Sequence, residues 1–209
     1  MSTAPARPYG GRSADERRAE RRARLLDAGL DVVAEKGWPN TTVRDVCTRA
    51  KLTERYFYEA FGDRQGLLLA LFDHVADGVR EVVVEALADA PEDAAGRARK
   101  AITAYVKKVA ADPRQTRILF FEASDDAALQ ERRQAAILMF AHLVRDQAAE
   151  FYGVSGPGKK DAELTSHVLV GGLAQLLVAW QVGDVKVGQA RLIEHATQLF
   201  VAVAGVRSG

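Results

Sequence analysis

The chain has 209 residues, and its 29 Lys and Arg side chains against 28 Asp and Glu side chains give a formal net charge of +1. Hydrophobic residues make up 48% and charged residues 27%, which excludes a collagen-like or broadly disordered protein and is typical of a globular one. Because Cys47 is the single cysteine, an intramolecular disulfide and a cysteine-rich zinc site are excluded, and a reducing compartment such as the cytoplasm is expected.

The N-terminal end predicts a tail followed by a long helix. Residues 1–12 contain prolines and glycines but no apolar period and no apolar segment of a signal peptide, so we expect a mobile tail. Ser13 and Glu16 have the spacing of a capping box, in which each side chain bonds a free backbone N–H at a helix start. The helix that they open should end at Lys36-Gly37, since glycine readily takes the left-handed conformation that ends helices.

Two short helices are predicted next. Thr42 and Asp45 repeat the capping-box spacing, and Thr53 can cap a further helix that runs to about Tyr58. Apolar side chains at helical spacing in the first of these helices include Cys47, which we interpret as a buried structural thiol rather than a redox sensor. The pair has the spacing of a helix-turn-helix, in which the later helix enters the major groove of DNA.

The rest of the chain is also predicted to be helical. A long helix should begin near Asp63 and reach about Leu87, and breaks at proline and glycine positions separate the helices that follow. These later helices are expected at residues 92–111, 113–122, 126–152, 161–182 and 188–204. No segment alternates apolar and polar residues as a strand does, so the predicted fold class is all-α. The most apolar stretch, residues 168–182, is shorter than the roughly 20 residues that span a bilayer, so no membrane partner is expected.

The charges are unevenly distributed along the chain. Residues 1–64 hold 13 basic and 10 acidic side chains, and residues 17–24 alone hold five arginines and one glutamate. This excess indicates an anionic partner such as DNA, although a solvated helix face has the same composition. The histidines are scattered without metal-ligand spacing, and no phosphate loop, nucleophile elbow or zincin motif occurs. We therefore expect no metal, no cofactor and no catalytic site.

The segment from residue 24 to residue 68 resembles the DNA-binding region of the TetR-type transcriptional regulators. The residues that carry the resemblance, without a gap in their spacing, are Arg24-Leu25-Leu26-Asp27-Ala28, Glu35-Lys36-Gly37-Trp38, Thr41-Thr42-Val43-Arg44-Asp45-Val46, Ala50, Phe57-Tyr58, Phe61 and Leu67-Leu68. A match of this length is far more specific than a generic helix-turn-helix pattern. The run from Gly171 to Trp180, with Gly183, also resembles the dimer-forming penultimate helix of this family, though less specifically.

The resemblance implies a protein of two domains. Residues 13–62 would form a three-helix helix-turn-helix DNA-binding domain, and residues 63–209 a helical ligand-binding and dimerisation domain. Carried onto this sequence, the base-reading positions would be Glu54, Arg55 and Tyr56. The phosphate-facing positions would be Thr42, Thr53, Tyr58 and Arg64, with Lys51 as an added cation in the turn. The family often has smaller residues at Arg55 and Tyr56, so the operator sequence cannot be taken from relatives.

Candidate residues for a ligand and for a second copy of the chain lie on the later helices. Large or polar side chains that could line a ligand pocket are Tyr105, Phe120, Phe121, Glu122, Met139, Phe140, His142, Gln175 and Trp180. Candidates for the dimer interface are Leu164, Val168, Gly171, Gln175, Val178, Val182, Ile193, Ala196, Phe200 and Ala204. A two-fold dimer would present two recognition helices to a palindromic operator in double-stranded DNA.

These features favour a dimeric, cytoplasmic transcriptional repressor that an unknown small-molecule effector releases from its operator. An alternative is a helical small-molecule-binding or catalytic protein with a vestigial DNA-binding domain. A third hypothesis retains the DNA function but has a protein effector or none, and it predicts a packed C-terminal core without a sizeable cavity. Gly66 and Gly78, in the helix that joins the two domains, are candidate points of bending.

Overall fold

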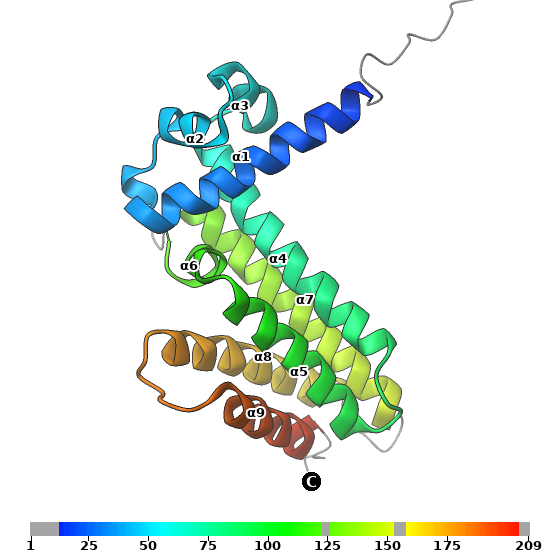
Figure 1. The fold of residues 1–209 in the computed structure, drawn as a ribbon. Helices are drawn as coiled ribbons and strands as arrows, with labels where there is room; N and C mark the ends of the chain where they lie inside the picture. The colour runs from blue at the N-terminus through cyan, green and yellow to red at the C-terminus, as the bar shows by residue number, and fades with distance from the viewer. Residues whose placement is uncertain (1–12, 123–125, 153–157, 205–209) are drawn as a thin grey trace, which may run out of the picture. The chain divides into compact units, whose positions relative to one another are not determined.

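The computed structural model describes residues 13–122, 126–152 and 158–204, and every regular element within these ranges is helical (Figure 1). In chain order the elements are α1 (Ala14–Lys36), the 3-10 turn η2 (Trp38–Asn40), α2 (Val43–Ala50), α3 (Glu54–Phe61), α4 (Arg64–Ala88), α5 (Ala94–Ala111), α6 (Pro113–Phe120), α7 (Ala127–Tyr152), α8 (Lys159–Gln181) and α9 (Gln189–Ala204). The prediction of an all-α fold is confirmed, and the predicted helix ends lie within one turn of the observed ends. The expected tail over residues 1–12 lies outside the described residues.

The chain divides into two compact units, and the boundary between them falls inside α4. The N-terminal unit comprises residues 1–71, and the C-terminal unit comprises residues 72–209. Leu67 and Leu71, from the first turns of α4, are fully buried. A Cβ atom added to Gly29 of α1 would lie 3.2 Å from Leu71 Cδ2, so the two helices approach closely at this glycine. The first turns of α4 are therefore part of the packing of the N-terminal unit.

In the N-terminal unit, capping residues stand at the helix starts and glycines stand at the ends of α1 and α3. The capping boxes predicted at the starts of α1 and α2 are both present, with the hydroxyls of Ser13 and Thr42 each accepting a backbone N–H. Thr53 occupies the N-cap position of α3, but its side chain makes no capping bond. Helix α1 ends at Gly37 with φ 75°, and α3 ends at Gly62 with φ 78°, a conformation that glycine adopts without strain.

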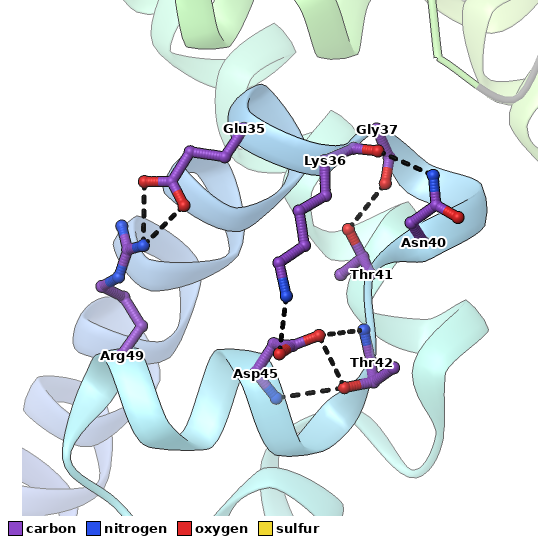
Figure 2. A network of polar contacts seen from close by, with 8 residues as sticks. All are labelled: Glu35, Lys36, Gly37, Asn40, Thr41, Thr42, Asp45 and Arg49. Atoms are coloured by element: carbon purple, nitrogen blue, oxygen red, sulfur yellow. Dashed lines mark hydrogen bonds and ion pairs between the residues drawn. The ribbon is translucent and has the colours of Figure 1, made fainter.

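Polar contacts fix α2 against the end of α1 (Figure 2). Lys36 Nζ donates a hydrogen bond to Asp45 Oδ1 at 2.8 Å. Arg49 Nη2 donates to both carboxylate oxygens of Glu35, at 2.8 and 2.7 Å. All four side chains are partly or fully exposed, so each pair contributes little alone, but together they set the position of α2.

Acid should weaken this network. Hydrogen bonds from Lys36 and Thr42 lower the pKa of Asp45 from 3.8 to about 2. A carboxylate with a depressed pKa in the folded state stabilises the fold above its unfolded pKa, and that contribution is lost as the pH falls. We expect the N-terminal unit to lose stability between about pH 4 and about pH 2, and the Asp45→Asn variant to lose less over that range. Thermal unfolding at several pH values checks this, and identical pH dependence of both proteins would contradict it.

Helices α4, α5, α8 and α9 form the core of the C-terminal unit. Its buried apolar residues are Val79, Ile102, Val106, Val109, Leu173, Leu177, Leu192, Ile193 and Ala196. Helix α7 packs along α8, and Arg133 of α7 donates hydrogen bonds to the carbonyl oxygens of Ile118, Leu119 and Glu122. These bonds satisfy carbonyl groups that the end of α6 leaves free, and they attach α6 to α7.

Candidate DNA-binding site and ligand cavity

Helix α3 has a buried apolar side and an exposed polar side. Phe57 is fully buried, and its ring makes edge contacts with the rings of Tyr58 and Phe61, with centroid distances of 5.6 and 5.3 Å. Glu54 and Arg55 are exposed on the other side. A short helix that follows a turn and carries a row of exposed side chains is the arrangement with which helix-turn-helix proteins read the major groove.

The three predicted base-reading residues differ in their surroundings. The Arg55 side chain is 84% exposed, and its Nε lies 2.8 Å from Glu59 Oε1. This hydrogen bond raises the pKa of Arg55 and holds the guanidinium along the outer side of α3. Tyr56 is half-buried, and the guanidinium carbon of Arg21 lies 4.5 Å from its ring centroid. Glu54 and Arg55 are thus open to solvent, whereas Tyr56 packs against a side chain of α1.

Four of the predicted phosphate-facing residues are exposed, namely Thr42, Lys51, Thr53 and Tyr58. The Thr53 hydroxyl is not used in capping, so it is available to an external acceptor or donor. The Thr42 hydroxyl, in contrast, donates to Asp45 Oδ2 at 2.7 Å within its own capping box. Hydroxyl and ammonium groups near a helix start are suited to phosphate oxygens.

Arg64, the remaining predicted phosphate-facing residue, is half-buried against Trp38. Its guanidinium carbon lies 4.2 Å from the centroid of the indole ring, and its Nη2 donates to the carbonyl oxygen of Trp38. These contacts link the start of α4 to the turn after α1. Arg64 therefore has a structural role in the N-terminal unit, and its contact with phosphate stays a prediction.

The sequence reasoning missed Arg44 as a candidate for contact with DNA. Arg44 is exposed on α2, and within the part of the chain that the structure describes it makes no ion pair. Arg49, the other arginine of the same helix, pairs with Glu35. The signal was available, because Arg44 lies on the opposite side of this amphipathic helix from the buried Val46.

Lys51, the residue that ends α2, has a left-handed backbone conformation with φ 53° and ψ 47°. That conformation costs an L-residue about 1–2 kcal/mol that glycine avoids. We expect the Lys51→Gly variant to unfold with a free energy about 1 kcal/mol higher than wild type, and to bind DNA more weakly because one cation is lost. Denaturant unfolding and DNA titration of the same variant measure the two effects. A variant less stable than wild type would contradict the argument.

The C-terminal unit contains a cavity of about 150 Å³, lined by residues of α4, α5, α7, α8 and α9. On α5, the small side chains of Ala94, Ala98 and Ala101 recur at i, i+4 and i+7 and leave room for it. Tyr105 and Phe140 also line it, with ring centroids 6.0 Å apart. A mostly apolar cavity with few polar groups is typical of a site for a small ligand.

Two of the predicted pocket residues, Tyr105 and Phe140, line this cavity. Phe120 and Trp180 pack against the apolar core and do not line this cavity. Five further candidates are not among the lining residues of this cavity, namely Phe121, Glu122, Met139, His142 and Gln175. Large size alone therefore did not identify the lining, which is formed mainly by small and medium apolar side chains.

Glu122 is buried, as a pocket carboxylate would be, but it already has a partner. Its Oε1 accepts a hydrogen bond from Arg117 Nε in an ion pair. A buried carboxylate without a partner would favour a cationic ligand. In the structure, its charge is balanced by Arg117, so it gives the cavity no selectivity for cations.

The sequence reasoning also missed the polar residues that the cavity does contain, Arg97 and Gln147. Arg97 Nε and Nη2 donate to Gln147 Oε1 at 3.0 and 2.6 Å. Charged residues on an amphipathic helix are normally assigned to the surface, which is why Arg97 was not considered. The signal that could have found it is its position within the alanine-rich face of α5.

Helix α8 has an apolar face that its own unit leaves uncovered. Leu164 is 67% and Val168 71% exposed, and a Cβ atom added to Gly171 or Gly172 would meet nothing within 4 Å. The six interface residues predicted on this helix are all at least partly exposed: Leu164, Val168, Gly171, Gln175, Val178 and Val182. By length and composition alone α8 could also cross a membrane. An exposed apolar face of this size calls for a partner.

On α9 the predicted interface residues do not form an outer face. Ile193, Ala196 and Phe200 face the interior of the unit. The side chain of Ala204 lies outside the described part of the chain. The exposed apolar residues of α9 are instead Leu199 and Val203. The helical period of this segment was interpreted correctly, but Ile193 and Ala196, which were assigned to an interface, are buried in the core of their own unit.

Comparison with known proteins supports this geometry. The family described as bacterial regulatory proteins, tetR family, matches residues 25–71, which end where the N-terminal unit ends. The HTH-type transcriptional regulator BetI of Burkholderia ambifaria is 32% identical over 116 residues. That alignment covers 54% of this chain and 60% of BetI, so the chain matches less than two thirds of the length of this relative.

Two solved structures have the same fold as most of the chain. The fatty acid degradation regulator FadR from Bacillus halodurans gives a TM-score of 0.76 at 18% identity and covers 87% of this chain and 94% of its own. FadR from Bacillus subtilis, solved in complex with stearoyl-CoA, gives 0.73 at 17% identity and covers 88% and 98%. The segment 25–71 is thus similar to the DNA-binding segment of the tetR family of bacterial regulatory proteins, and most of the chain has the fold of these two structures.

Proposed function

We propose that this protein is a sequence-specific repressor that binds DNA as a dimer and is released by a small molecule in the cavity. The observation that carries the proposal is the outer face of α3, where Glu54 and Arg55 are exposed on a helix anchored by Phe57. Arginine can bind guanine through two hydrogen bonds, which discriminates against other bases by about 1–3 kcal/mol. The exposed cations Arg44 and Lys51 are suited to phosphate contacts.

The uncovered face of α8 supports a dimer. Leu164 and Val168 are large apolar side chains that water would otherwise surround, and burying them against a second copy is favourable by about 25 cal/mol per Å². Gly171 and Gly172 let two backbones approach closely, because no Cβ atoms intervene. A two-fold symmetric dimer presents two copies of α3, so the proposed operator is a palindrome in double-stranded DNA. We propose that the protein acts on this operator in the cytoplasm.

The cavity supports release by a ligand. FadR from Bacillus subtilis has the same fold and was solved in complex with stearoyl-CoA. In this chain α4 belongs to both compact units, so a ligand that favours one position of α4 in the C-terminal unit would change the separation of the two recognition helices. The shift in DNA affinity can be no larger than the ligand's preference for one state over the other.

Substitution of Arg55 tests the proposed base reading. We expect Arg55→Ala to weaken binding to an operator selected from random DNA by about 10–100-fold, while affinity for unrelated duplex DNA changes little. Arg55 is exposed and paired only with Glu59 among the described residues, so the variant should fold as wild type does. Fluorescence anisotropy titrations on both DNAs at several salt concentrations measure the difference.

Arg44→Ala is the matched control for this experiment. As a phosphate contact, Arg44 should contribute equally to both DNAs, and its loss should reduce the slope of log affinity against log salt by about 1. An equal loss of affinity for operator and unrelated DNA in Arg55→Ala would assign Arg55 to the DNA backbone and contradict the proposed reader.

A further inference from the structure

The ligand cavity holds one cation that no carboxylate balances. Arg97 lines the cavity, and of its five N–H donors two bond the amide oxygen of Gln147. Within the described ranges the guanidinium makes no other hydrogen bond and no ion pair. Arg114 and Arg117, which are also half-buried in the C-terminal unit, each pair with a carboxylate, Asp112 and Glu122. Arg97 is therefore a partly desolvated charge whose remaining donors are free for an external anion.

The orientation of Gln147 favours this use of Arg97. Its Nε2 donates to Glu150 Oε2 at 3.2 Å, which leaves its Oε1 facing the guanidinium. The amide thus holds Arg97 in place by a neutral acceptor without cancelling its charge. Arg97 and Gln147 both line the cavity, so the held guanidinium borders the space that a ligand would occupy.

The rest of the cavity is suited to a hydrocarbon. Apart from Arg97, Gln147 and the Tyr105 hydroxyl, its lining side chains are apolar, as Ala98, Val144 and Leu173 illustrate. The Tyr105 hydroxyl has no hydrogen-bond partner among the residues that the structure describes, and burial raises its pKa, so it stays protonated and can donate to a ligand oxygen. Since one water needs about 10–15 Å³ of such space, the cavity of about 150 Å³ admits on the order of ten non-hydrogen atoms.

We infer that the ligand of this cavity is an amphiphilic anion, with a medium-length apolar body among the aliphatic side chains and one carboxylate or phosphate bound by Arg97. This inference rests on the proposed function, because it names the chemical class of the effector. A charged hydrogen bond of this kind contributes about 1.5–3 kcal/mol, which corresponds to roughly 10–100-fold in affinity. A neutral ligand of the same length would lack this contribution, and a cationic one would be repelled.

Binding of three ligands with the same chain length tests the inference. Decanoate, decan-1-ol and decylamine are titrated into the 209-residue protein by calorimetry near neutral pH, without DNA. We expect decanoate to bind about 10–100-fold more tightly than decanol, and decylamine to bind no more tightly than decanol. Equal affinity for decanoate and decanol, or tighter binding of decylamine, would overturn the inference.

Variants of Arg97 separate a direct contact from a structural role. Arg97→Gln should abolish the preference for decanoate over decanol while retaining decanol binding, and Arg97→Lys should restore part of the preference. Arg99→Gln is the matched control, since Arg99 lies two residues away on α5 and pairs with Glu194 outside the cavity lining. An unchanged preference in Arg97→Gln would overturn the assignment of Arg97 to the anion.

Two further measurements complete the test. One distinguishes a phosphate from a carboxylate as the bound anion, and the other separates the ligand class from the proposed release of the operator. Decyl phosphate has the same chain with its charge on a phosphate, so tighter Arg97-dependent binding of this ester than of decanoate assigns the anion to a phosphate, and the reverse order assigns it to a carboxylate. Decanoate that binds as expected but leaves the operator bound contradicts the proposed release and not the ligand class. If neither anion binds, the inferred ligand class is overturned, whereas the proposed DNA binding, which is measured separately, still stands.

Discussion

The Gly66→Ala variant should unfold with a free energy about 2–3 kcal/mol lower than that of wild type. A Cβ atom on Gly66 would lie 2.0 Å from the carbonyl oxygen of Phe61 and 3.1 Å from its carbonyl carbon. Both atoms belong to the backbone at the end of α3, which cannot move aside as the end of a side chain does. Alanine would otherwise favour a helix over glycine by about 1 kcal/mol, so the measured loss understates the steric cost.

Gly78→Ala in the same helix is the matched control. A Cβ atom there would meet only Lys108, at 3.3 Å from Cε and 3.4 Å from Nζ, and this flexible side chain can move. We expect this variant to be as stable as wild type or up to about 1 kcal/mol more stable. Urea unfolding followed by Trp38 fluorescence, in a Trp180→Phe background, reports on the N-terminal unit. If Gly66→Ala unfolds at the same urea concentration as Gly78→Ala, the close approach of α3 and α4 is contradicted.

Val168→Asp should convert the proposed dimer into monomers. Val168 is 71% exposed on the apolar face of α8, and a two-fold interface would bury the new carboxylate twice. An unpaired buried charge costs about 3–5 kcal/mol, so the dissociation constant should rise by about 100-fold or more. Because operator binding needs both copies of α3, affinity for the operator should fall with it.

Val84→Asp provides the same chemical change away from this face. Val84 is exposed on α4, so the aspartate stays in water in both monomer and dimer. Sedimentation velocity of wild type and both variants at micromolar concentration measures the assembly, and flotation with phospholipid vesicles measures any membrane binding of α8. A Val168→Asp variant that sediments as a dimer, or a wild type that floats with vesicles, would contradict the proposed role of α8.

Most of the helix ends could be predicted from the sequence, because each depends on residues within one turn of the end. The capping boxes at Ser13 and Thr42 and the glycine at position 37 act on backbone groups within a few residues, so spacing alone predicted these helix ends. The end of α3 was predicted at about Tyr58, and the helix continues to Phe61. The exposed face of α3 could be predicted in the same way. The buried Phe57 and the exposed Arg55 follow from the helical period once α3 is assigned.

The cavity and the interface depend on contacts between distant helices, which the period does not specify. Helices α8 and α9 carry apolar residues on more than one side, so the sequence did not distinguish Ile193, in the core, from Leu199, on the surface. Arg97 was overlooked because a charged residue on an amphipathic helix usually faces water. In the structure it borders a cavity, since small alanines surround it on α5.

Selection of binding sites from random duplex DNA tests the central claim most directly. The 209-residue protein is incubated with the pool at physiological salt, and bound DNA is amplified and sequenced over several rounds. The account predicts a palindromic winner whose affinity falls steeply with salt and drops selectively in Arg55→Ala. Enrichment of no sequence, with only weak binding that is the same for every duplex, would contradict a sequence-specific regulator.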